Sequence, residues 1–230
     1  MWPKRLEKYH SILEIKDYIK STKIEFKRND LRGKIKICVI DDDSFKPRAN
    51  LENYGFQFDE LQDIKSIEKV SPYDIVICDL MDVGVNFDAA RGGASIIGEI
   101  KNNFPAKFVI AYTGARANSA EANAAKEHAD LYLKKDIEIT DLVAELDSAI
   151  DYSLDPYERW IITRQSLIDL DVDLREVLKL EDAYVTSVIE KDSNLGTFRS
   201  AIQGSGISGH AKSMAQSLAA SIVYGILFPA

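Results

Sequence analysis

Short apolar runs alternate with amphipathic stretches between residues 34 and 152, and this alternation is the feature that most limits the possible folds. The apolar runs have the length and composition of buried strands, whereas the stretches between them have helical spacing. Strands that alternate with helices form right-handed βαβ units, and hence a doubly wound parallel sheet covered on both faces. The five expected strands are 34–40 (KIKICVI), 55–61 (GFQFDEL), 73–80 (YDIVICDL), 106–114 (AKFVIAYTG) and 130–135 (DLYLKK).

The alternation stops on both sides of this α/β region. Residues 1–33 are rich in Lys and Arg and place apolar residues at helical spacing over 4–20, which predicts a basic amphipathic helix. After residue 152 the pattern is helical, and Asp155, Pro156 and Glu158 suit the N-cap, N1 and N3 positions of a helix. We therefore predict three parts: an N-terminal helix (1–33), an α/β domain (34–152) and an all-α C-terminal region (153–230).

Composition limits the setting and the partners of the chain. The two cysteines, Cys38 and Cys78, lie within expected strands, which argues against a disulfide scaffold and predicts a reducing, cytoplasmic location. The formal net charge of −8 argues against nucleic acid as a partner. The last apolar run, SLAASIVYGILFPA, is shorter than the roughly 20 residues that cross a bilayer, so we expect no membrane insertion.

Residues that suit phosphoryl chemistry occur at the ends of the expected strands. Asp41 and Asp42 follow the first strand, and Asp79, Thr113 and Lys135 lie at the ends of the third, fourth and fifth. Because the carboxyl ends of parallel strands meet at one edge of a sheet, we expect these side chains to lie close together. Crowded carboxylates repel one another, and a bound Mg²⁺ ion would relieve that repulsion. An aspartate beside Mg²⁺ can accept a phosphoryl group, whose oxygens a hydroxyl and an ammonium group can hold.

Four segments at these strand ends, VIDDDS, IVICDL, FVIAYTGA and DLYLKKD, resemble in order the signature blocks of the receiver domain of two-component response regulators. The resemblance covers about residues 34–152 and implies a CheY-like, flavodoxin-like fold with strand order 2-1-3-4-5. It also implies a Mg²⁺ site formed by Asp41, Asp42, Asp79 and the backbone carbonyl of Met81.

The same resemblance implies a role for four side chains. Asp79 would be the phosphoacceptor, and Thr113 and Lys135 would bind the phosphoryl oxygens. Tyr132 would be the aromatic residue that moves when the domain is activated. Lys134 is an alternative to Lys135, because the two lysines are adjacent in the sequence.

The chain departs from the receiver pattern in three places. Asp136 follows the lysine where the family commonly has proline. The segment after the acceptor, MDVGVNFDAARGG, is several residues longer than the family's MPxxDG. The stretch between Asp42 and Asp79 is short, so the first helix or the second strand of the domain should be trimmed.

These features favour a response regulator in a phosphorelay that switches protein–protein contacts. The implied partners are a histidine kinase or phosphotransfer protein, and an output protein or a second copy of the chain. One alternative is a receiver-like interaction module that works without phosphorylation, and a DNA-binding regulator is a lesser alternative. A phosphatase is disfavoured, because Met81 occupies the position where such enzymes carry a second aspartate. We therefore expect no enzyme activity beyond the chain's own phosphorylation and dephosphorylation.

Overall fold

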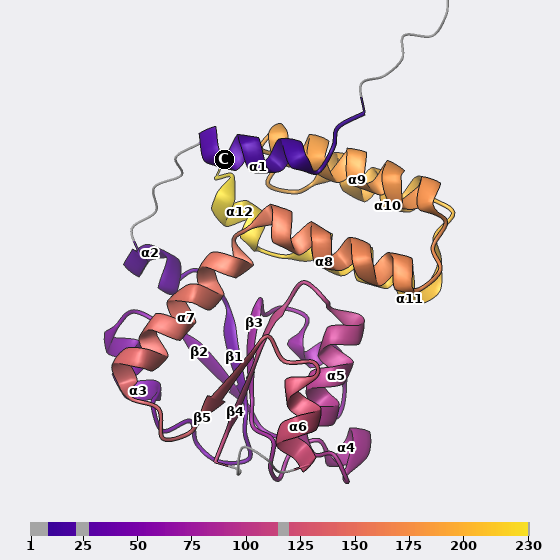
Figure 1. Ribbon diagram of the computed structural model, residues 1–230. Coiled ribbons are helices and arrows are strands. Elements are labelled where there is room, and N and C mark those ends of the chain that lie inside the picture. The colour runs from indigo at the N-terminus through magenta and orange to yellow at the C-terminus, as the bar shows by residue number, and fades with distance from the viewer. Residues whose placement is uncertain (1–8, 22–27, 115–119, 230) are drawn as a thin grey trace, which may run out of the picture.

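A five-stranded parallel sheet forms the centre of the computed structural model, which describes residues 9–21, 28–114 and 120–229 (Figure 1). The strand order is β2-β1-β3-β4-β5, with every neighbouring pair parallel. This confirms the predicted sheet and its flavodoxin-like order. The strands are β1 (Ile37–Ile40), β2 (Phe58–Leu61), β3 (Ile75–Cys78), β4 (Phe108–Thr113) and β5 (Leu131–Lys134).

Helices cover both faces of the sheet, which is why the central strands are apolar throughout. All residues of β1 and β3 are buried. Alternate residues point to opposite faces, so Ile37 and Val39 join one hydrophobic cluster, while Cys38 and Ile40 join another. The first face packs against α3 (Arg48–Asn53) and α7 (Ile139–Ser153), and the second against η1 (Ile67–Val70), α5 (Gly93–Asn103) and α6 (Ala120–Lys126). Helix α3 has only six residues, which fits the prediction that the first helix or the second strand is trimmed, whereas β2, with four residues, is as long as β1, β3 and β5.

A helical bundle follows the sheet and packs beside the amino ends of its strands (Figure 1). Its core is aromatic: the Trp160 ring stacks on Tyr184 with centroids 5.1 Å apart, and Phe198 packs edge-on against both. The Tyr184 hydroxyl donates to Pro156 O at 2.8 Å and lies 2.8 Å from the Tyr224 hydroxyl. The bundle helices are α8 (Pro156–Asp169), α9 (Leu174–Ile189), α10 (Gly196–Gly204), α11 (Gly209–Ala220) and α12 (Val223–Leu227).

Charged residues are buried where the bundle meets the sheet. Asp74, directly before β3, is only 3% exposed and accepts a hydrogen bond of 2.6 Å from Ser221 Oγ. Arg159 of α8 is 2% exposed, and its Nη2 atom lies 3.7 Å from Asp74 Oδ1. Lys107, directly before β4, donates to Ser71 O at 2.9 Å. Because buried charges are costly unless they are paired, these contacts favour one placement of the bundle.

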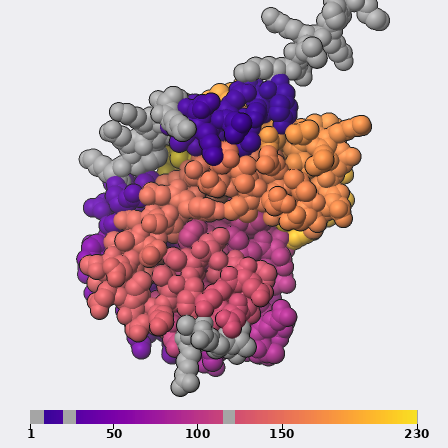
Figure 2. Space-filling view, in the orientation of Figure 1, coloured from indigo at the N-terminus to yellow at the C-terminus, as the bar shows by residue number. Residues whose placement is uncertain are grey.

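The described residues of the N-terminal segment form two helices, where one helix was predicted for residues 1–33. Helix α1 (Leu13–Ser21) packs on α8 and α9, and Figure 2 shows it lying over the bundle. Helix α2 (Arg28–Arg32) packs on α7. Residues 4–8 lie outside the described part of the chain. The helix starts only at Leu13 because Ser11 binds the first turn: Ser11 Oγ accepts from Leu13 N at 3.4 Å, and Glu14 accepts from Ser11 N at 3.3 Å.

Three details of the C-terminal region bear on the sequence predictions. The Asp155 side chain accepts from the amides of Tyr157 and Glu158, which confirms the predicted helix start. Helix α9 is continuous over 16 residues, in keeping with the helical pattern after residue 152. The small residues Ala211, Ala215 and Ala219 of α11 are buried in the core of the bundle. In the described ranges, no helix has both the length and the apolarity that a membrane crossing requires.

Candidate phosphoacceptor site

Asp41 and Asp79 are placed side by side by the two central strands of the sheet. Each follows its strand directly, and the last residues of those strands, Ile40 and Cys78, are register partners. The Asp79 amide donates to Ile40 O at 2.8 Å, which fixes the backbone of one aspartate against that of the other strand. The side chains of Asp41 and Asp79 are both 5% exposed. The sheet therefore holds two carboxylates close together at its carboxyl edge, as predicted.

Asp42 completes a group of three carboxylates. One ligand oxygen from each of Asp41, Asp42 and Asp79 lies within 4.8 Å of the others. Unlike Asp41 and Asp79, Asp42 is exposed. Desolvation, and then the negative charges of Asp43, Asp82 and Asp41, raise the pKa of Asp42 above its usual value, although its own backbone hydrogen bond opposes the shift. The three carboxylates therefore repel one another, and a bound cation would relieve that repulsion.

Lys135 bridges the two buried carboxylates. Its Nζ atom lies 2.8 Å from Asp41 Oδ2 and 2.8 Å from Asp79 Oδ2. Desolvation disfavours the charged ammonium, but the hydrogen bonds to Asp41 and Asp79 outweigh it and raise the pKa of Lys135 to about 12. Lys134, the alternative, is the exposed last residue of β5. The geometry therefore favours Lys135 as the lysine of the site.

The remaining oxygens of the two aspartates accept backbone hydrogen bonds. Asp41 Oδ1 accepts from Asp43 N at 3.0 Å, and Asp79 Oδ1 accepts from Leu80 N at 2.7 Å. These bonds hold the carboxylates in one orientation. Among the hydrogen bonds described for it, Asp79 Oδ2 is held only by Lys135.

Thr113 and Tyr132 lie on the strands beside the acidic group. Thr113 is the fully buried last residue of β4, and its carbonyl accepts from Lys135 N at 3.0 Å. Tyr132 of β5 packs against the α5–α6 cluster, with Lys126 Nζ 5.0 Å from its ring centroid. The Tyr132 hydroxyl is buried, and within the described ranges it has no hydrogen-bond partner. The switch roles of both residues remain predictions.

The loop after Asp79 contains a helix that the sequence patterns did not predict, α4 (Val85–Asp88). The backbone on either side of α4 packs so tightly that Gly84 and Gly93 have no room for a side chain. A Cβ atom on Gly93 would lie 1.8 Å from Asp79 O, and one on Gly84 would lie 2.3 Å from Gly92 O. Asp63 Oδ1 accepts from Gly84 N at 2.7 Å and ties the loop to the segment after β2. Met81 lies in this loop with its side chain 44% exposed.

Asp63 was not recognised from the sequence, since it has no motif of its own. The adjacent glycines Gly92 and Gly93 were a visible signal for a tight loop closure.

The donor set suits a hard divalent cation. Carboxylate and carbonyl oxygens are the ligands that Mg²⁺ and Ca²⁺ prefer, and three carboxylates face only one bridging ammonium. In the described ranges, this is the one group of three or more acidic, histidine or cysteine side chains close enough to share an ion. The residues present therefore fit the metal that the sequence resemblance implies.

Receiver domain proteins are among the solved structures that resemble about half of this chain. No protein-family model matches the sequence, and a search of curated proteins finds no relative. Similar solved structures include a receiver domain protein from Clostridium thermocellum, 29% identical, covering 51% of this chain and 94% of that one, with a TM-score of 0.38. The chain resembles CheY-like response regulator receivers.

Two longer response regulators also resemble the chain. One is a Burkholderia pseudomallei response regulator with a phosphorylated aspartic acid, calcium ion and citrate; it is 17% identical and covers 76% of this chain and 99% of that one, with a TM-score of 0.39. The other is RcsB from Salmonella enterica serovar Typhimurium, bound to promoter rprA in the presence of phosphomimetic BeF3⁻. It is 19% identical and covers 79% of this chain and 98% of that one, with a TM-score of 0.41.

Proposed function

We propose that the chain is a response regulator that accepts a phosphoryl group on Asp79 and passes the change to protein–protein contacts. The observation that carries this proposal is the bridge from Lys135 to both Asp41 and Asp79, with Asp42 completing the acidic group. A structural ion pair needs one carboxylate, whereas three carboxylates at a strand edge suit a cation and an incoming phosphoryl group. The site thus has the parts that phosphoryl transfer requires.

The transfer itself is a single displacement at phosphorus. Asp79 Oδ2 forms the new O–P bond while the bond from phosphorus to the donor breaks, and the donor keeps the electron pair and takes a proton. The donor is the imidazole of a phosphohistidine, supplied by a kinase or phosphotransfer protein. Lys135 then moves its hydrogen bond from Asp79 to a phosphoryl oxygen, and the Thr113 hydroxyl binds another.

A Mg²⁺ ion held by Asp41, Asp42, Asp79 and the Met81 carbonyl would offset the charge on the transferred group. The chain's own residues do the rest. Lys135 holds the side chains of Asp41 and Asp79 beside each other, and the backbone amide of Leu80 holds the Asp79 carboxylate in place. When Thr113 turns towards the phosphoryl group, the Tyr132 side chain gains room to move, which changes the surface formed by β5 and the helices on either side of it.

The helical parts on either side of the receiver region are proposed to be the output. In this division, residues 34–152 receive the phosphoryl group, and residues 153–230 with the N-terminal segment contact an output protein or a second copy of the chain. The protein works in the cytoplasm and performs no turnover on other substrates beyond its own phosphorylation and dephosphorylation.

Intact mass spectrometry tests the proposal. Wild type incubated with a small phosphodonor, acetyl phosphate or phosphoramidate, and Mg²⁺ should gain the mass of one phosphoryl group, and Asp79→Asn should gain none. Asp82→Asn is a matched control, because Asp82 is exposed nearby and its φ of 57° suits asparagine. Chelation of Mg²⁺ should abolish the gain. Wild type that stays unmodified with both donors would contradict the proposal.

A second candidate is an interaction module that works without phosphorylation. The observation that favours it is the position of the bundle, which meets the amino ends of the strands while Asp79 lies at their carboxyl ends. Cellular activity that survives Asp79→Asn but is lost when α9 is altered would favour this module. A DNA-binding output is a lesser variant, and salt-dependent binding to duplex DNA would reveal it.

A further inference from the structure

Helix α9 has a continuous face that α1 covers only in part. The residues of this face are spaced three or four apart, which makes them neighbours on the helix surface: Leu174, Leu178, Glu181 and Val185. Glu181 and Val185 are buried, and Glu181 accepts a hydrogen bond of 3.0 Å from Tyr9 Oη, just before α1. One turn closer to the start of α9, Leu178 is 49% exposed and Leu174 is 61% exposed, and no described residue covers them.

The open part of this face belongs to a larger apolar surface at the turn between α8 and α9. Ile168 and Leu170, at the end of α8, are also exposed. Together with Leu174 and Leu178 they form the densest run of exposed large apolar residues in the described part of the chain, and we call these four residues the turn surface. The turn lies at the end of the bundle that points away from α7 (Figure 1). Single exposed apolar side chains need no explanation, whereas a group of them marks a contact surface.

Three carboxylates stand among these apolar side chains. All three are exposed, and within the described ranges none of them forms an ion pair: Asp169, Asp171 and Asp173. Lys179 does not neutralise them, because its Nζ atom lies 2.6 Å from Glu176 Oε1. Arg175 is the one cationic residue between residues 168 and 178. With three carboxylates against one guanidinium, the turn surface is acidic and favours a basic partner.

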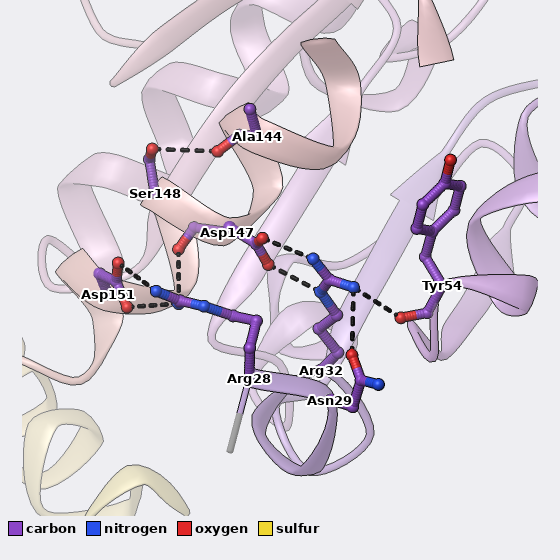
Figure 3. Close-up of polar contacts among 8 residues, drawn as sticks. All are labelled: Arg28, Asn29, Arg32, Tyr54, Ala144, Asp147, Ser148 and Asp151. Atoms are coloured by element: carbon purple, nitrogen blue, oxygen red, sulfur yellow. Dashed lines mark hydrogen bonds and ion pairs between the residues drawn. The ribbon is translucent and has the colours of Figure 1, made fainter. Parts of the chain in front are cut away.

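The contact between α2 and α7 shows how an acidic helix face of this chain binds a basic helix (Figure 3). Asp147 of α7 accepts two hydrogen bonds from Arg32, Nε to Oδ1 at 2.8 Å and Nη2 to Oδ2 at 2.6 Å. One turn further along α7, Asp151 accepts two hydrogen bonds from Arg28. Between the two arginines, Leu31 of α2 is buried in the hydrophobic core. The turn surface offers the same two elements, carboxylates and apolar contacts, and within the described ranges no helix is bound to it.

We propose that the turn surface binds a basic amphipathic helix of an output protein, whose apolar face covers Leu174 and Leu178 and whose Lys or Arg side chains pair with Asp171 and Asp173. A groove of about 610 Å³ beside the turn, between it and the start of α11, leaves room for the long basic side chains. A second copy of the chain fits the surface less well, because it would bring two sets of like charges together. The inference rests on the proposed function for the role of the surface as output, but the contact itself requires no phosphoryl group.

Fluorescence anisotropy with a labelled model peptide tests the turn surface. The probe is an amphipathic helical peptide of Leu and Lys, and its control is the same peptide with Glu in place of Lys. The unmodified chain should bind the Lys peptide, more weakly as salt is raised, and should not bind the Glu peptide. The double variant Leu174→Gln with Leu178→Gln should bind the Lys peptide at least about ten-fold more weakly. Val85→Gln is the matched control: Val85 is similarly exposed, on α4, and its loss should leave binding unchanged.

A second double variant, Asp171→Asn with Asp173→Asn, tests the charge of the surface. It should bind the Lys peptide more weakly than wild type does and with a smaller salt dependence. Asparagine suits both positions, because Asp171 has a φ of 54° and Asp173 caps α9. Equal binding of the Lys peptide by wild type and the double leucine variant would overturn the proposal, and so would equal binding of the two peptides by wild type.

Two further results would assign the surface to another occupant and overturn the proposal. One is a dimer of wild type in sedimentation that the double leucine variant does not form. The other is binding of the Lys peptide only after residues 1–8 are removed. Asp79→Asn should bind the peptide as wild type does. A chain that binds the peptide but gains no phosphoryl group would count against the proposed function alone, and one that is phosphorylated without binding the peptide would count against the turn surface alone.

Discussion

Lys107 should make the stability of the protein rise with pH in the mildly alkaline range. It lies between the sheet and the bundle, 6% exposed, and donates to the carbonyls of Ser71 and Tyr73. Desolvation lowers its pKa from 10.5 to about 8; the charge of Asp74 opposes this shift, and that of Arg159 adds to it. The native state therefore releases the Lys107 proton at lower pH than the unfolded state does.

The sign and size of the effect follow from proton linkage. Between the two pKa values the unfolded chain binds more protons than the native protein, so the free energy of unfolding increases with pH. A shift from 10.5 to about 8 corresponds to roughly 3 kcal/mol over the whole range, and to about 2 kcal/mol from about pH 7.5 to about pH 9.5. Below about pH 8 the native state holds a charged, buried Lys107, which lowers the free energy of unfolding by most of this amount. Above about pH 10.5 Lys107 is neutral in both states and this destabilisation is absent.

Urea unfolding of wild type and Lys107→Met at several pH values isolates this contribution. Other groups without a direct interaction with Lys107, such as Cys78, whose burial raises its pKa, change stability in the opposite direction as pH rises. They do so equally in both proteins, so the difference between wild type and variant reports Lys107. That difference should grow by about 2 kcal/mol from about pH 7.5 to about pH 9.5, whereas the exposed Lys69→Met should show no such trend. A constant difference would refute the reasoning.

Three further predictions concern the site and the bundle core. Gly93→Ala should destabilise the protein by about 1–3 kcal/mol in urea unfolding and slow phosphorylation, because the new Cβ would lie 1.8 Å from Asp79 O; an unchanged midpoint and rate would contradict the loop geometry. Lys135→Met should abolish phosphorylation in the mass assay while Lys134→Met retains it, and the reverse result would assign the site to the other lysine. Tyr184→Phe should cost about 1–2 kcal/mol in urea unfolding, since it leaves a buried hydroxyl and a carbonyl without their partner; an unchanged free energy of unfolding would show that this hydroxyl is dispensable.

The α/β region was predictable because its signals are local. An apolar run such as that of β3 shows its burial in consecutive residues, and the acids that follow each strand need only the rule that parallel strands share an edge. That rule brought Asp41, Asp79 and Lys135 to one point although they lie far apart in the sequence. The helix start at Asp155 was likewise a signal within a few residues.

The parts that escaped prediction depend on contacts between distant segments. Asp74, Lys107 and Arg159 look like ordinary surface charges in the sequence, and only the docking of the bundle buries them. The loop helix α4 exists because Gly84 and Gly93 close against other backbone atoms, which no periodicity records. In the N-terminal segment, α1 packs on the bundle and α2 packs on α7. The amphipathic pattern of the segment predicts an apolar face but does not indicate which element that face contacts.

The placement of the bundle at the amino ends of the strands leaves the carboxyl edge of the sheet clear of it (Figure 1). A protein that contacts the residues around Asp79 and another that contacts the bundle would bind at opposite ends of the sheet. The two binding surfaces therefore share no residues, and occupation of one does not by itself cover the other.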